Sequence, residues 1–149
     1  MLAHLDSVDR SGNEMSDVLC ARMLERLLAQ AHCLEVLNLS GNRIGTFASE
    51  QLSELLFADG AVLRELSLNS CRITDNCKDA DGEIALSFIT ASTTVRKLSL
   101  RDNLIGDAGI RSMADTLSLN KALTELDLSW NNIGIACFLE LLEITCLLL

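Results

Sequence analysis

A single pattern, L-x-x-L-x-L-x-x-N-x-I followed by a small residue, occurs five times along this chain of 149 residues. The copies begin at Leu5, Leu34, Leu63, Val95 and Leu123. The intervals between these starts are 29, 29, 32 and 28 residues, and similar residue types return at the same offsets within each copy. Self-similarity at such a period is the signature of a repeat architecture, so the whole chain is predicted to be a repeat array.

The array is predicted to form one domain over residues 1–149, because the chain has no proline and no stretch that resembles a linker. Its units run near 5–33, 34–62, 63–94, 95–122 and 123–149. Within a unit, apolar residues first alternate with polar ones, as in a strand, and a later pair such as Leu52 and Leu56 lies one helical turn apart. Each unit is therefore predicted to be a strand, a turn and a helix.

Stacking of these units follows from the apolar face that one unit alone leaves exposed. Parallel strands should form one wall and helices the other. Because neighbouring helices need about 10 Å and neighbouring strands about 4.8 Å, the stack should curve with the strands on its concave side.

A row of asparagines marks the point where the chain leaves each strand. Its members are Asn13, Asn42, Asn103 and Asn131, with Cys71 in the third unit. An amide there can donate to and accept from backbone groups that would otherwise be buried without partners. Three residues later the position is small: Ser16 and Thr74 are expected to cap the following helix, whereas glycines 45, 106 and 134 are expected to permit a sharp turn.

The segments L-N-L-S-G-N-R-I-G at 37–45 and L-D-L-S-W-N-N-I-G at 126–134 resemble the leucine-rich repeat family, ribonuclease-inhibitor-like subclass. The resemblance covers residues 5–149. It implies an α/β fold, a leucine-rich repeat solenoid shaped as a curved horseshoe arc, with a parallel sheet on the concave face and helices on the convex face. It also implies a non-enzymatic scaffold that binds a protein partner. Two further functions of similar proteins stay open: regulation of a small GTPase, as in the Ran GTPase-activating protein, and filament capping, as in tropomodulin.

The composition restricts the classes of partner that the chain is expected to bind. The net charge of −9 and the pI near 4.6 disfavour nucleic acid and anionic membranes and favour a protein with a basic surface. The N-terminal segment at 1–10 lacks a basic region followed by an apolar run, so a cytoplasmic location is expected. None of the six cysteines shows C-x-x-C spacing, which favours reduced thiols over zinc or disulfides.

The third, fifth and seventh positions of each strand should point into the concave face. Charge gathers there only in the last two units, beside the sole tryptophan. The predicted partner-binding residues are Lys97, Arg101, Asp102, Glu125, Asp127 and Trp130. Exposed Trp and Arg are enriched among residues that dominate binding energy. The structural alternative is that Lys97 and Glu125 only pair across strands and that Trp130 packs over the edge of its unit.

The third unit contains an insertion in which D-A-D-G-E-I, with Asp79 and Asp81, resembles the middle of an EF-hand calcium loop. Aligning the glycine puts Cys77 at the first ligand position and Phe88 at the twelfth, where a glutamate is required. Calcium therefore stays a weak alternative to a solvated loop, and no metal or other cofactor is expected. Catalysis is not expected either, because neither histidine has a nucleophile nearby and no phosphate-binding loop is present.

The last predicted helix is unusually apolar for the end of an array, which normally carries a polar outer face. Its apolar residues are Phe138, Leu139, Leu141, Leu142, Ile144 and Leu147 to Leu149. Two explanations stay open: the chain is a fragment of a longer array, or this end self-associates with another copy.

Overall fold

The computed structural model describes residues 5–74 and 86–146, with the backbone alone for Phe88 and residues 144–146. Strands and helices alternate along the described chain, as the repeat predicts. The elements are β1 (Ser7–Asp9), α1 (Asp17–Leu28), β2 (Val36–Asn38), α2 (Thr46–Phe57), β3 (Glu65–Ser67), α3 (Leu86–Thr90), β4 (Lys97–Ser99), α4 (Asp107–Leu119), β5 (Glu125–Asp127) and α5 (Ile135–Cys146).

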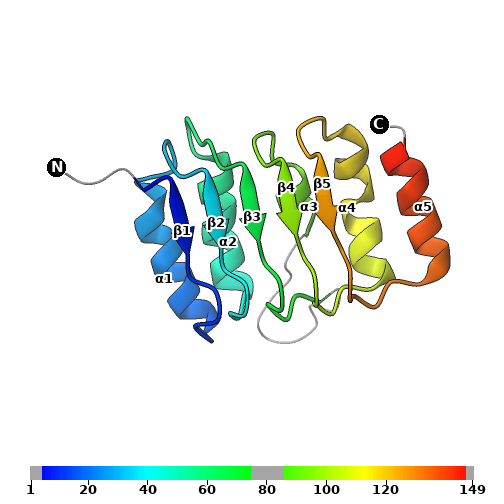
Figure 1. The fold of residues 1–149 in the computed structure, drawn as a ribbon, viewed down its shortest axis with the longest axis horizontal. Helices are drawn as coiled ribbons and strands as arrows, with labels where there is room; N and C mark the ends of the chain where they lie inside the picture. The colour runs from blue at the N-terminus through cyan, green and yellow to red at the C-terminus, as the bar shows by residue number, and fades with distance from the viewer. Residues whose placement is uncertain (1–4, 75–85, 147–149) are drawn as a thin grey trace.

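The five strands form one parallel sheet in the order β1-β2-β3-β4-β5, so each unit pairs only with its neighbours in sequence. The register preserves the repeat: Leu37 lies opposite Leu66, Leu66 opposite Leu98, and Leu98 opposite Leu126. Figure 1 shows the strands side by side along the length of the molecule, with the helices in a second layer behind them. The predicted solenoid, with strands on one wall and helices on the other, is confirmed.

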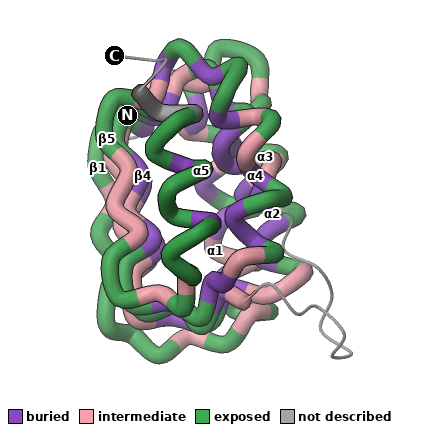
Figure 2. The backbone as a smooth tube through the Cα atoms, turned by 90° about the vertical axis from the view of Figure 1, so that its right-hand side faces the viewer, coloured by how far each residue is buried: buried purple, intermediate pink, exposed green. Residues whose placement is uncertain are grey.

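The core is a single layer between the two walls, seen as the purple interior of Figure 2. It consists of the repeated apolar positions; the strand leucines Leu37, Leu66 and Leu98 are at most 2 % exposed. On the helix side, Leu52 and Met113 from the predicted helical row are fully buried. Removing a strand leucine and a helical apolar residue from water at each unit supplies the driving force that one isolated unit would lack.

The asparagine row works as predicted, and the structure adds that its bonds join neighbouring units. The Asn42 amide donates to the carbonyls of Arg10 and Leu39 at 2.8 Å each, and its carbonyl accepts from the N–H of Met15 at 2.9 Å. At the substituted position the Cys71 thiol lies 3.4 Å from the Leu39 carbonyl. The row is thus a ladder that ties each turn to the unit before it.

Helix caps differ from the expectation. Ser16 occupies the N-cap of α1 without a side-chain capping bond, and the residues that follow Thr74 lie outside the described range. The α2 N-terminus is capped instead by Asp17 of the preceding unit, whose carboxylate accepts from the N–H groups of Gly45 and Ala48 at 2.8 Å each and of Phe47 at 3.1 Å. A carboxylate there also complements the positive end of the helix dipole.

The close approach of this capping carboxylate, rather than a sharp turn, explains why a glycine follows the strand at this position. Gly45 has a φ of −116°, which other residues also adopt. A Cβ on Gly45 would lie 2.7 Å from the Asp17 carboxylate, and one on Gly134 would lie 3.0 Å from that of Asp107. The Asp107 carboxylate accepts from the Gly134 N–H at 2.7 Å, so the same arrangement recurs at α5. Glycine is needed because the capping carboxylate approaches so closely.

In the third unit the described part of the helix is α3, which begins directly after the residues outside the description. The predicted insertion, with Asp79 and Asp81, lies outside the described residues. Within α3, Ile89 is 2 % exposed and belongs to the core.

The last helix is apolar on its outer side, as expected. Ile135 is 80 % exposed, Phe138 48 %, Leu139 54 % and Leu142 41 %, whereas Leu141 is buried against the array. Of the other residues named for this end, the side chain of Ile144 and residues 147–149 are outside the description.

Candidate functional site

The predicted site residues come from β4, β5 and the turns that follow them, which are adjacent in the sheet. We call them the strand-face patch: Lys97, Arg101, Asp102, Glu125, Asp127 and Trp130. The structure brings these residues together on two neighbouring strands and their turns, in one cluster around Lys97 and another around Trp130. A hollow of about 270 Å³ lies on this face, between β3, β4 and β5.

Lys97 lies between two carboxylates. Its Nζ is 3.4 Å from Glu125 Oε1 on β5 and 3.6 Å from Glu65 Oε1 on β3. The charges of Glu125 and then Glu65 raise the pKa of the lysine above its ordinary value. The expected pair with Glu125 therefore exists, and Glu65 is a third member that the sequence analysis did not include. Because all three side chains are about half exposed, a partner can displace these contacts at small cost.

Trp130 does not pack over the edge of its unit. Its side chain is among the most exposed apolar groups described, at 74 %. The Arg101 guanidinium lies over the indole, 5.6 Å from the ring centroid, and also donates to the Ser129 hydroxyl at 3.2 Å. Such a cation–π contact is worth about 0.5–1 kcal/mol at exposed sites, enough to bias the orientation of the ring without burying it.

The backbone at Trp130 is left-handed, with a φ of 59°. The equivalent position in every unit shares this conformation; it is held by Gly12, Gly41, Ser70, Asp102 and Trp130, with φ values from 53° to 71°. Glycine adopts this region without penalty, whereas a bulky side chain costs about 1–2 kcal/mol. The fifth unit thus places its largest side chain where the first two units have none. Gly12 and Gly41 at the same offset were the signal in the sequence that this position is special.

The two aspartates of the patch accept hydrogen bonds from residues of the turns. Asp102 Oδ2 accepts from the Ser70 hydroxyl at 2.7 Å, which links it to the third unit. Asp127 Oδ1 accepts from the Ser129 N–H at 2.9 Å. Hydrogen bonds from the Ser129 hydroxyl and N–H, and then the nearby charge of Arg101, hold the pKa of Asp127 below its ordinary value. The Asp127 carboxylate thus helps to fix the turn that carries Trp130, whereas the Asp102 carboxylate joins the turn after β4 to the turn of the third unit.

We also searched the described part of the chain for a metal site, an activated cysteine and a membrane-spanning helix. Residues 5–74 and 86–143 contain no cluster of three His, Cys, Asp or Glu side chains that could hold a metal. Burial raises the pKa of the Cys20 and Cys71 thiols to about 11, so neither is an activated nucleophile. No described helix combines the length and apolarity needed to cross a membrane.

Comparison with known proteins agrees with the repeat and the fold. A leucine-rich repeat family model matches residues 30–46, 61–76, 91–114 and 119–134, which contain the asparagine ladder and most of the strands. The chain is also 31 % identical over 146 residues to the ribonuclease inhibitor of Sus scrofa. It is a leucine-rich repeat protein of the ribonuclease-inhibitor-like kind. Leucine-rich repeats of this kind generally serve as protein-interaction modules.

The relatives of this leucine-rich repeat protein are longer. The match covers 81 % of the chain and 32 % of the ribonuclease inhibitor. A second relative, the human NACHT, LRR and PYD domains-containing protein 3, is 29 % identical over 106 residues, covering 71 % of the chain and 10 % of that protein. The chain thus spans a third or less of these two relatives. Among solved structures, the Leiomodin-1 Actin-Binding Site 2 superposes with a TM-score of 0.48 at 15 % identity, over 93 % of this chain and 62 % of that one.

Proposed function

We propose that this leucine-rich repeat protein is a non-enzymatic, cytoplasmic module that binds a protein partner through its concave strand face and adjoining loops, with the strand-face patch at the centre. The observation that carries the proposal is Trp130, which is 74 % exposed in a left-handed backbone conformation beneath Arg101. Every unit has this left-handed turn, but only the fifth unit places a bulky side chain in it, at a cost of about 1–2 kcal/mol. Nothing in the stability of the free protein requires an indole here, since glycine would fit the same backbone without strain.

Energetics favour this patch as the anchor. Trp and Arg are the residue types most enriched among those that dominate binding, and here they are already in contact before a partner arrives. A preorganised pair loses less side-chain entropy on binding than two freely rotating side chains would. Around it, Glu65, Glu125 and Asp127 outnumber Lys97, which together with the net charge of −9 favours a partner with basic groups.

The test uses Trp130 as its own probe, because it is the sole tryptophan. Partners captured by the wild-type protein are identified and purified, and their binding is measured from the indole emission and by calorimetry. Arg101→Glu and Trp130→Gly should each weaken binding at least tenfold, since both remove a central contact. Arg111→Glu is the matched control, because Arg111 is exposed on α4, away from the strands. If both patch variants bind as the wild type does, the proposal is wrong.

A second candidate is self-association through α5. Four large apolar side chains lie on its outer side, Ile135 being 80 % exposed. Contiguous apolar surface of this kind marks interaction sites in soluble proteins. Light scattering over a concentration series should show a dimer or larger species, and Ile135→Glu combined with Phe138→Glu should restore the monomer. A wild-type mass that stays monomeric at every concentration would refute this candidate. The described residues offer no observation in favour of GTPase regulation or filament capping.

A further inference from the structure

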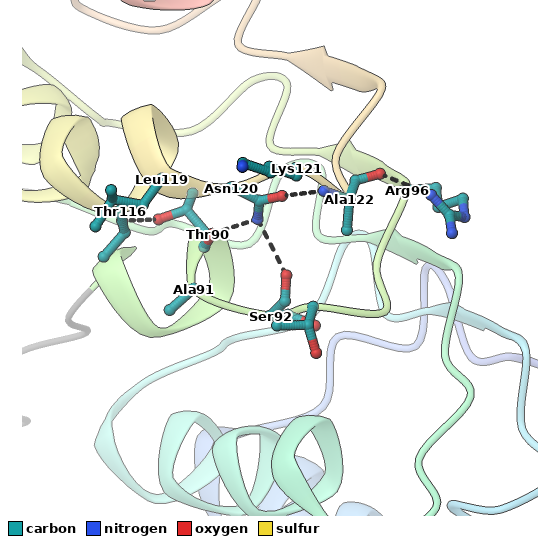
Figure 3. A pocket seen from close by; sticks show the side chains of 10 residues that line it. Thr90, Ala91, Ser92, Arg96, Thr116, Leu119, Asn120, Lys121 and Ala122 are labelled. Carbon is teal, nitrogen blue, oxygen red and sulfur yellow. Dashed lines mark hydrogen bonds between the residues drawn. The ribbon is translucent and has the colours of Figure 1, made fainter. Parts of the chain in front are cut away.

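A second hollow lies away from the strand-face patch. It has a volume of about 590 Å³ and sits between the C-terminal ends of α3 and α4 and the segments that lead into β4 and β5 (Figure 3). Trp130 follows β5, whereas the pocket residues precede β4 and β5, so the two sites are at opposite ends of the strands. A volume of this size is within the range of about 300–1,000 Å³ typical of ligand sites.

The floor of this α3–α4 pocket is preorganised by Asn120, which is 9 % exposed. Its amide donates to the carbonyls of Thr90 and Ser92, and its carbonyl accepts from the N–H groups of Ala122 at 2.7 Å and Leu123 at 2.8 Å. In Figure 3 the Asn120 side chain lies at the centre of this network, with Thr116 and Thr90 facing each other beside it. These bonds tie unit four to unit three, so the pocket does not have to form when a ligand arrives.

The rim is cationic, although the chain is acidic. Arg96 and Lys121 are the ionisable residues that line the pocket, and both are exposed. The Arg96 guanidinium donates to the Ala122 carbonyl at 3.3 Å, and among the described residues no carboxylate forms an ion pair with it. Among the described residues Lys121 has no ion-pair partner. Leu119, 78 % exposed, supplies an apolar part of the pocket lining.

An internal comparison shows that this charge is not a property of the repeat. The corresponding hollow between the ends of α1 and α2, about 460 Å³, is lined by Glu54 and Asp59 together with His32. In the second unit the position equivalent to Arg96 is Glu35. The same place in the fold is therefore acidic near the N-terminus and basic between the third and fourth units.

We propose that the α3–α4 pocket binds an extended acidic segment of a protein partner, with carboxylates at Arg96 and Lys121 and a small apolar side chain against Leu119 and the pocket floor. The two cations emerge from different strand-leading segments, on either side of Ala122 in Figure 3, which suits two separated carboxylates. Guanidinium and ammonium donors form charge-assisted bonds to carboxylates. This inference rests on the proposed function only in taking the occupant to be a protein segment.

The test uses the whole chain and a defined probe, the hexapeptide acetyl-Glu-Asp-Leu-Ala-Asp-Glu-amide, with its Gln and Asn counterpart as the neutral control. Binding is followed by calorimetry and by the amide signals of Thr93 and Lys121 in ¹H–¹⁵N spectra. The acidic peptide should bind and shift these signals, and the neutral one should not. Arg96→Glu and Lys121→Glu should each weaken binding about tenfold, whereas Arg111→Glu, which changes the net charge equally, should change it by less than about twofold.

Each alternative outcome overturns the proposal. No binding of the acidic peptide, equal binding of the neutral peptide, or equal weakening by Arg111→Glu would each exclude a specific acidic-segment site. A shift in Trp130 emission without movement of the pocket signals would place the peptide on the strand-face patch instead. The peptide experiment does not involve the natural partner of the strand-face patch. A negative result would therefore overturn the proposal for the pocket without deciding the proposed function of the patch.

Discussion

Replacing Asn103 by alanine should destabilise the protein far more than the same change at Asn13. The Asn103 side chain is 5 % exposed; its carbonyl accepts from the N–H groups of Cys71 and Ile73 at 3.0 Å each, and its amide donates to the carbonyls of Leu68 and Leu100. Alanine leaves two buried N–H donors without this acceptor. At about 1–3 kcal/mol for each, the cost is about 2–6 kcal/mol, and we expect about 3 kcal/mol because a water molecule can enter the space.

The control is built into the repeat. Asn13 occupies the same position in the first unit, where it is exposed and its amide donates within its own unit, to the Arg10 carbonyl at 2.7 Å. Its replacement should cost less than about 1 kcal/mol. Urea unfolding followed by circular dichroism gives both free energies of unfolding and their m-values. Equal losses for the two variants, or a loss below about 1 kcal/mol for Asn103→Ala, would refute the argument that the ladder derives its stabilisation from buried bonds between units.

Three further predictions follow from individual contacts. Cys71→Asn should raise the free energy of unfolding by about 1 kcal/mol, because an amide there can donate to the Leu39 carbonyl that the thiol now meets at 3.4 Å; urea unfolding with no gain would contradict this. Asp17→Ala should lower the free energy of unfolding by about 1–2 kcal/mol, because three N–H groups at the start of α2 lose their acceptor. Asp17→Asn should recover part of this loss, and urea unfolding measures both variants. The pKa of Asp127 in the folded protein lies below its ordinary value of 3.8. The stabilisation that the ionised carboxylate supplies is therefore fully present above pH 3.8 and is lost as the pH falls through the lower folded-state pKa. Acid titration of stability should therefore be less steep for Asp127→Asn, and an unchanged profile would show that the Ser129 bonds do not stabilise the carboxylate.

The strand-face patch shows how much of the candidate site could be predicted from the sequence. Lys97 and Glu125 could be placed on adjacent strands, and Trp130 in the turn that follows, because parallel strands in register repeat the same offsets. The sheet pairs Lys97 with Glu125 as the spacing requires. The contribution of Glu65 was missed because Lys97 is flanked by two neighbours, and the sequence does not show toward which one a long side chain leans. The left-handed backbone at Trp130 was also missed, although glycine at the same offset in two other units indicated it.

The capping carboxylates of Asp17 and Asp107 and the α3–α4 pocket depended on structure for a different reason. Each arises where two units meet through their helices, and a window of one unit contains only half of the contact. The sequence by itself determined the class of fold, the order of the strands, the buried rows and the asparagine ladder, because all of these follow from a fixed period and the alternation of side chains. Only the tertiary structure decided which polar atoms bond between units, which glycines are needed for space and where the surface is hollow, because these depend on the lateral distance between helices, which packing of the whole array sets.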